Sequence, residues 1–170
     1  MPETLRDKLE AGPMYDGAIV EHHFTPYMRD YDILVDVASA VPDGSRSYIA
    51  VRYLFRFTHC VLAHITTRVS DEAWRTSWSD EYTDYKMWEK AETPPGYVWG
   101  VCRSEVYPGL TYVEDSELGR EWSQRLRHAM HEVMIETNSQ RVNLIFHDVI
   151  IKEVALGDPD TNELRPVVPR

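Results

Sequence analysis

Several residue types and patterns that mark particular protein classes are scarce in this 170-residue chain. It has two cysteines, Cys60 and Cys102, too few to indicate the disulfide framework of a small secreted domain. Its eight glycines are scattered, and there is neither a phosphate-binding loop nor a Gly-x-Ser-x-Gly turn. No apolar run approaches the roughly 18 residues of a membrane span. Basic residues number 18 against 28 acidic ones, and the net charge of −10 argues against broad binding to nucleic acid or anionic membranes.

The overall composition is that of a globular protein, with 43% hydrophobic and 27% charged residues. A chain of this length is expected to form one domain with its own core. We expect an N-terminal arm over residues 1–13, a single domain over residues 14–156 and a flexible tail over residues 157–170. Acidic side chains interrupt the first thirty residues, so these do not form a secretion signal, and we expect a cytoplasmic protein.

Alternating apolar residues predict a β-hairpin in the N-terminal half. Apolar side chains fall two apart from Tyr31 to Val37 and again from Ile49 to Phe57, which is the period of a half-buried strand. Between these runs, Pro42-Asp43-Gly44 favours a turn, because proline presets φ and glycine accepts a positive φ. The two runs are therefore expected to pair as antiparallel strands.

Charged residues occupy the other face of this hairpin. A turn centred near residue 43 places Asp30 roughly opposite Arg56. Asp32 then lies diagonally near Arg56, and Asp36 has the same relation to Arg52. Cross-strand pairs of opposite charge are a sufficient reason for this pattern, with a polar binding surface as the alternative.

Further periodic patterns predict an α+β fold. A short helix is expected over Glu3–Glu10, and a longer one at residues 116–131, where apolar residues recur at helical spacing. Strands are expected at Ala18–Phe24, at Val133–Thr137 and, as one long strand, at Val142–Val154. Because strands and helices do not alternate from the start, we expect a mostly antiparallel sheet with one or two helices packed on one face.

The segment from Ser70 to Glu92 is both aromatic and acidic. Trp and Tyr residues recur every three or four positions, which predicts one helix or two, and seven acidic residues stand against three basic ones. An aromatic stripe is most often core, but an acidic and aromatic outer face suits a basic protein partner, because Trp and Tyr are over-represented at binding hot spots. The candidate contact residues are Asp80, Glu81, Asp84, Trp78 and Trp88.

Three of the seven histidines form a candidate metal site. His128 and His131 are three apart in the predicted helix, so their imidazoles share one side, and His147 offers a third ligand. Zinc suits such a set, and Glu132 or Asp148 would be the acid–base group of an enzyme built on it. The spacing departs from the metalloprotease pattern. Histidine is also favoured electrostatically at a helix C-terminus, so a structural role is the alternative.

Two further features of the sequence, one cysteine and a group of aromatic residues, have simple interpretations. Cys60 lies among strand residues, and we expect a buried, unreactive thiol rather than a nucleophile. The aromatic residues of positions 74–99 can instead line a cavity between sheet and helix, which would make the protein a small-ligand receptor.

Several stretches together resemble the YxiG-like domain proteins. They are residues 27–32, 53–60, 97–100, 130–138 and 144–149, and the resemblance extends from Asp16 to Glu153. It implies a bacterial cytoplasmic protein. The genes of the name-giving members lie near genes for contact-dependent toxins, and this association implies an immunity-type role. The family offers no activity and no catalytic residues to carry over.

The leading hypothesis is a non-catalytic binding protein that neutralises a basic toxin domain by direct contact. An acidic inhibitor gains fast association with a basic cleft from electrostatic steering. The alternatives are the histidine-based metal site or enzyme and the aromatic-lined ligand cavity. A homodimer formed through an exposed edge strand is also compatible with the pattern.

Overall fold

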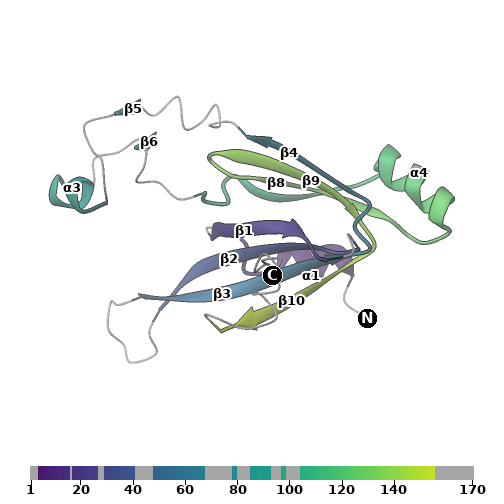
Figure 1. Cartoon of the computed structure of the whole chain (residues 1–170), viewed down its shortest axis with the longest axis horizontal. Coiled ribbons are helices and arrows are strands. Elements are labelled where there is room, and N and C mark those ends of the chain that lie inside the picture. Colours follow the sequence, from purple (N-terminus) through teal and green to yellow (C-terminus); the bar gives the residue numbers. More distant parts are fainter. Residues whose placement is uncertain are drawn as a thin grey trace, which may run out of the picture.

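The computed structural model describes residues 4–15, 17–26, 29–40, 48–67, 78–79, 85–92, 97–98 and 104–155. Within these residues, two four-stranded antiparallel sheets lie one over the other (Figure 1). The first sheet has the order β1 (Ala18–Phe24), β2 (Tyr31–Ala40), β3 (Tyr48–Thr58) and β10 (Asp148–Val154). The second has the order β4 (Leu62–Thr67), β9 (Gln140–Phe146), β8 (His131–Glu136) and β7 (Gly109–Val113). The expected α+β, mostly antiparallel fold is confirmed.

Three helices and one short strand pair complete the described elements. α1 (Leu5–Glu10) begins at Thr4, whose side chain caps it, and the helix contacts β7 and β10. α4 (Glu117–Leu126) contacts β8 and β9 at one end of the molecule (Figure 1). The remaining elements are α3 (Tyr85–Lys90) and the parallel pair β5 (Trp78–Ser79) and β6 (Tyr97–Val98). No helix among the described residues is long and apolar enough to cross a membrane.

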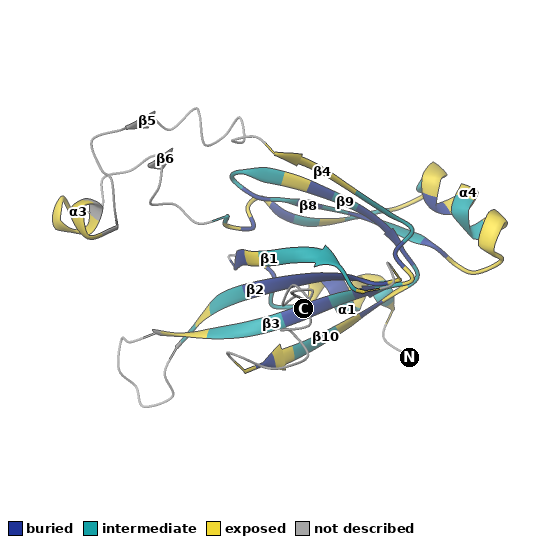
Figure 2. Cartoon of the chain, in the orientation of Figure 1, coloured by how far each residue is buried: buried dark blue, intermediate teal, exposed yellow. Residues whose placement is uncertain are grey.

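One apolar core lies between the two sheets. Successive side chains of a strand point to opposite faces, so alternate residues of each sheet face the other sheet, as the buried segments of the facing strands show in Figure 2. Phe57 of β3 and Phe146 of β9 meet edge to face, with ring centroids 4.9 Å apart. The core residues of the central strands are Ile33, Val35, Phe55, Phe57, Val133, Ile135, Val142, Leu144 and Phe146.

The predicted hairpin is present, but its register differs from the prediction. Asp32 lies directly opposite Arg56, and Asp36 directly opposite Arg52. Each carboxylate accepts two hydrogen bonds from its arginine, at 2.7–3.0 Å. The pairing is therefore centred one residue later than predicted, which moves each partner by two positions and leaves Asp30 outside the ladder. This register joins both pairs of opposite charge directly.

The long strand predicted at residues 142–154 is two strands in different sheets. β9 ends at Phe146, and β10 begins at Asp148 in the first sheet, with His147 between them. β3 passes into β4 beside it through residues 59–61. The His147 N–H donates to the Thr58 carbonyl (2.9 Å), and the Val61 N–H donates to the Ile145 carbonyl (2.8 Å). These bonds join the two crossings into one corner, as in two-layer sheets whose strands switch layers at a bend.

The helix predicted at residues 116–131 is shorter in the structure. Its start is confirmed, because the Ser116 hydroxyl accepts the Gly119 N–H at 2.8 Å. It ends at Leu126, since Arg127 has a left-handed backbone with φ 56°, and β8 begins at His131. Of the apolar residues that continued the helical pattern, Ala129 and Met130 lie in the loop before β8, and Val133 lies in β8.

The aromatic segment at residues 70–92 is not one continuous helix. The structure describes a strand at Trp78–Ser79 and a helix at Tyr85–Lys90 within it. Its other residues, and the predicted tail over residues 157–170, lie outside the described residues.

Candidate functional site

Three histidines gather at the corner where the chain changes sheets. The ring of His147 lies edge to face with two others, 5.8 Å from His59 and 5.7 Å from His128 between ring centroids. With Leu126 and Met130, these rings line a cavity of about 210 Å³. We call His59, His128 and His147 the histidine corner.

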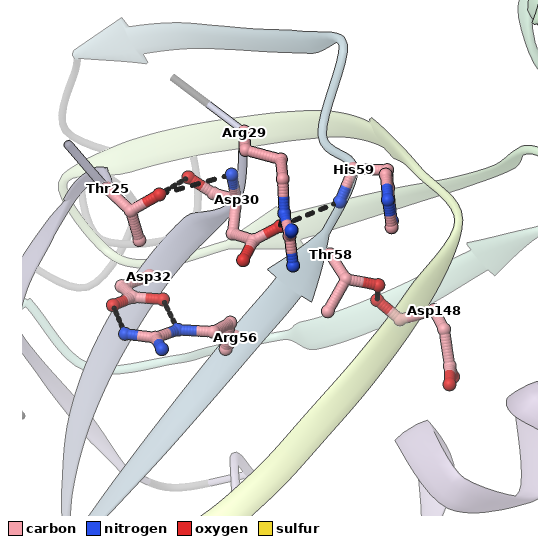
Figure 3. Close-up of polar contacts among 8 residues, drawn as sticks. All are labelled: Thr25, Arg29, Asp30, Asp32, Arg56, Thr58, His59 and Asp148. Atoms are coloured by element: carbon pink, nitrogen blue, oxygen red, sulfur yellow. Dashed lines mark hydrogen bonds and ion pairs between the residues drawn. The ribbon is translucent and has the colours of Figure 1, made fainter. Parts of the chain in front are cut away.

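Asp30 fixes the backbone of His59. β3 ends at Thr58, and His59 adopts a left-handed conformation with φ 49°, which is uncommon for a residue other than glycine. Its N–H donates to Asp30 Oδ1 at 3.0 Å, and Arg29 Nε donates to the same oxygen at 3.2 Å (Figure 3). Asp30 is only 7% exposed, so the turn carrying His59 rests on a buried acceptor.

A backbone carbonyl orients the ring of His147. His147 Nδ1 lies 2.7 Å from the Ala129 carbonyl oxygen. Because a carbonyl only accepts, Nδ1 carries the proton, and Nε2 of the neutral ring keeps a free lone pair. The neighbouring carboxylate of Asp148 accepts the Val149 N–H at 2.8 Å and lies 3.4 Å from Lys8 Nζ, and these contacts occupy the group predicted to act with the histidine cluster.

His131 does not line the cavity of the histidine corner. It is the first residue of β8, and a 2.7 Å hydrogen bond joins its Nδ1 to the Tyr112 hydroxyl. Burial lowers the pKa of His131, the proximity of His147 lowers it further, and Asp148 opposes the change. The sequence placed His131 beside His128 on a helix, but α4 ends before both residues.

The structure therefore brings together two of the three predicted metal ligands, His128 and His147, and adds His59. Among the described residues, no three histidine, cysteine or acidic side chains are arranged, as they stand, to hold a metal ion. His59 was missed because it was treated as a strand residue. The available signal was His147 inside an overlong predicted strand, since strands that change sheets need such breaks.

Glu132, the other predicted acid–base group, is held beneath the start of α4. One of its carboxylate oxygens accepts a hydrogen bond from the Ser116 hydroxyl, and the other lies 3.4 Å from Asn143 Nδ2. Glu132 and Ser116 line a polar cavity of about 150 Å³, together with His131 and Arg120. Because Ser116 is the residue that caps α4, Glu132 serves to anchor this helix to β8.

Cys60 has the properties of a structural thiol. It is 4% exposed, and its Sγ donates to the Leu62 carbonyl at 3.3 Å. Burial raises the pKa of the Cys60 thiol to about 12, so almost no thiolate forms near neutral pH. The prediction of a buried cysteine is confirmed.

The predicted protein-binding residues fall largely outside the described part of the chain. Asp80, Glu81 and Asp84 are not described. Trp78 lies in β5 and Trp88 in α3, without described side chains. The side chains of the aromatic residues predicted to line a ligand cavity, at positions 74–99, also lie outside the described part of the chain. The described side chains of α3, those of Lys86, Met87, Glu89 and Lys90, are all exposed (Figure 2).

Comparison with known proteins identifies one match. The family model described as YxiG-like protein matches residues 2–162, nearly the whole chain. None of the curated proteins and none of the solved structures matches this chain.

Proposed function

The chain belongs to the YxiG-like protein family, and we propose that it is a non-catalytic binding protein of the immunity type, which neutralises a basic toxin domain by direct contact. The observation that carries this proposal is the connection at residues 68–108. It joins β4 to β7, which are the two outer strands of the second sheet. Connections between neighbouring elements are usually about 4–6 residues long, and binding residues are disproportionately found on such connecting segments.

The composition of this connection suits a protein partner. It contains four of the five tryptophans of the chain, and its part from residue 70 to 92 has seven acidic and three basic residues. Trp and Tyr dominate binding hot spots, and acidic surroundings attract a basic partner over several ångströms. We place the contact on Trp78, Asp80, Glu81, Asp84 and Trp88.

The C-terminal end of this connection is hydrogen-bonded to the edge of the first sheet. The Ile19 N–H donates to the Ser104 carbonyl at 2.8 Å, and the Val106 N–H donates to the Gly17 carbonyl at 2.7 Å. Residues 104–106 are thereby tied to β1, so this end of the connection has a fixed position beside the first sheet.

The chemistry of the described residues also supports a binding role. Two groups that an enzyme could use have structural roles instead: Glu132 is held by Ser116 and Asn143, and Cys60 is buried. We also propose a cytoplasmic location, where an inhibitor would meet a toxin that had entered the cell.

The test begins with partner identification. Photo-crosslinking from position 88 in the native host, with a crosslinker at exposed Ile150 as the control, should capture one basic protein from position 88 only. The purified partner should then form a stoichiometric complex with this chain and lose its own activity in it. A complex that leaves the activity of the partner intact would refute the inhibitory role.

Charge variants then test the contact surface. The Asp80→Asn, Glu81→Gln, Asp84→Asn protein should associate roughly tenfold more slowly with the partner at low salt, and the difference should shrink at high salt. The matched control removes three exposed acids elsewhere, as Glu105→Gln, Glu117→Gln and Glu153→Gln. Equal association rates for the two variants would exclude this acidic segment as the contact.

A further inference from the structure

We propose that the histidine corner is a binding site for a divalent transition-metal ion, best suited to Zn²⁺, with His59, His128 and His147 as its ligands. The site lies where the two sheets join and uses none of the residues of the proposed protein contact. It differs from the set expected from the sequence, because His59 takes the place of His131.

The ring spacing is close to that of a metal site. With Zn–N bonds of about 2.0–2.1 Å, two imidazoles on one tetrahedral ion have ring centres roughly 5 Å apart. The centroid distances from His147 are 5.8 Å to His59 and 5.7 Å to His128. His59 and His128 are both exposed, so a small rotation of each ring toward His147 is sterically inexpensive. His59 and His128 must make this rotation, because the three side chains do not enclose an ion as they stand.

His147 is already oriented as a ligand. Its Nδ1–H donates to the Ala129 carbonyl, so the free lone pair is on Nε2. Histidine ligands in metal sites almost always donate their other ring N–H to a carbonyl or carboxylate, which fixes the tautomer and raises the basicity of the ligating nitrogen. Here the carbonyl belongs to the residue after His128, so the contact also holds the two ligands near each other.

The backbone frame around the ligands is restrained. The N–H of His59 is bonded to buried Asp30, and the N–H of His147 is bonded to the Thr58 carbonyl. Two of the three ligands therefore start from fixed backbone positions, which reduces the entropy lost when a metal binds.

The other lining residues select the class of metal. The cavity is lined by the three imidazoles, Leu126 and Met130, and none of these residues carries a carboxylate. Mg²⁺ and Ca²⁺ require oxygen ligands, whereas imidazole nitrogens suit Zn²⁺, Cu²⁺ and Ni²⁺. Three histidines leave one tetrahedral position for water, as in other three-ligand zinc sites.

Calorimetric titration of metal-stripped protein with ZnCl₂ tests the site. The wild type should bind one Zn²⁺, and His59→Ala, His128→Ala and His147→Ala should each weaken that binding at least about tenfold. His64→Ala is the matched control, because His64 is exposed on β4 and does not line the cavity. It should bind Zn²⁺ as the wild type does.

Cobalt substitution gives a second readout. Co²⁺ in the wild type should give the intense visible absorption of a tetrahedral site, and His128→Ala should lose it. Circular dichroism checks that each variant is folded. If His147→Ala does not fold, His128→Ala decides, because His128 lies in an exposed loop.

Three results would overturn the site: no stoichiometric Zn²⁺ binding by the wild type, equal weakening by His64→Ala, or unchanged binding when all three ligands are replaced. None of these measurements involves the protein partner, so the metal site and the proposed function succeed or fail separately.

Discussion

At the scale of single residues, burial decides how much an ion pair contributes. The side chain of Asp32 is 5% exposed and that of its partner Arg56 is 27% exposed, whereas Glu136 and Arg141 form a pair at the surface. Asp32→Asn removes the buried negative charge of this pair and should lower the free energy of unfolding by about 3 kcal/mol. Glu136→Gln should cost at most about 1 kcal/mol. Urea unfolding measures both, and similar losses for the two variants would contradict this account.

The raised pKa of Cys60 predicts a protected thiol. In a Cys102→Ser protein, where Cys60 is the remaining cysteine, reaction with Ellman's reagent at pH 8 should be at least about a hundredfold slower in the native state than in urea, because both thiolate formation and access are suppressed. Fast labelling of the native protein would show that the end of β3 opens readily.

His131 predicts a pH dependence of stability. Its pKa in the folded protein is lowered from 6.5, first by burial and then by His147. Between the two pKa values the unfolded chain binds more protons, so the free energy of unfolding rises with pH in this window. This contribution is complete above pH 6.5 and is lost as the pH falls toward the folded-state pKa.

The variant His131→Gln isolates this effect. Urea unfolding of metal-free protein from pH 5 to 7.5, with EDTA present, should show a smaller rise of stability with pH for His131→Gln than for the wild type. An unchanged slope would assign the pH dependence to other groups.

At the scale of elements, Asp30 joins the start of β2 to the corner between β3 and β4. Asp30→Ala removes the acceptor of the His59 N–H and should lower the free energy of unfolding by about 1–3 kcal/mol. Asp30→Asn keeps a side-chain oxygen and should cost less. Equal losses for Asp30→Asn and Asp30→Ala, measured by urea unfolding, would show that the charge and not the hydrogen bond matters.

The elements that follow from local pattern were predictable from the sequence, and those that depend on distant contacts were not. The hairpin of β2 and β3 alternates cleanly over its length, and Ser116 marks the start of α4 by its capping chemistry. The end of α4 depends on the left-handed backbone of Arg127. No glycine or asparagine marks this position in the sequence, so the helix end could not be predicted there. The break at His147 exists because β9 and β10 lie in different sheets. The alternation of apolar residues is the same whether or not a strand changes sheets, so it could not predict this break.

The same distinction applies to the candidate site. The sequence grouped His128 and His147, whose ring centroids lie 5.7 Å apart, with His131 through a predicted helix that ends before His128 and His131. His59 joins them through a corner built from β3 and β10, strands far apart in the chain. The spacing of residues along the chain cannot predict that His59 lies near His128 and His147.

At the scale of the whole molecule, the shared core predicts that the two sheets unfold together. Phe57 and Phe146 come from different sheets and meet edge to face. A double-mutant cycle with Phe57→Leu and Phe146→Leu should show a coupling of about 0.5–1.5 kcal/mol. Tryptophan fluorescence and circular dichroism should give coincident transitions. Phe57→Leu with Leu118→Ala, at an exposed position of α4, should be additive, and zero coupling between the two phenylalanines would mean that the sheets are independent.

The arrangement of the first sheet has a consequence for the newly made chain. β3 forms its final pairing with β10, and β4 pairs with β9, so both early strands leave the ribosome with an edge that stays unpaired until residues 140–154 follow. At about 5–20 residues per second, that interval is roughly 5–20 s. Throughout it the apolar face of β3 is open to aggregation with other nascent chains. Expression at high level should therefore depend on chaperones more than the stability of the finished protein suggests.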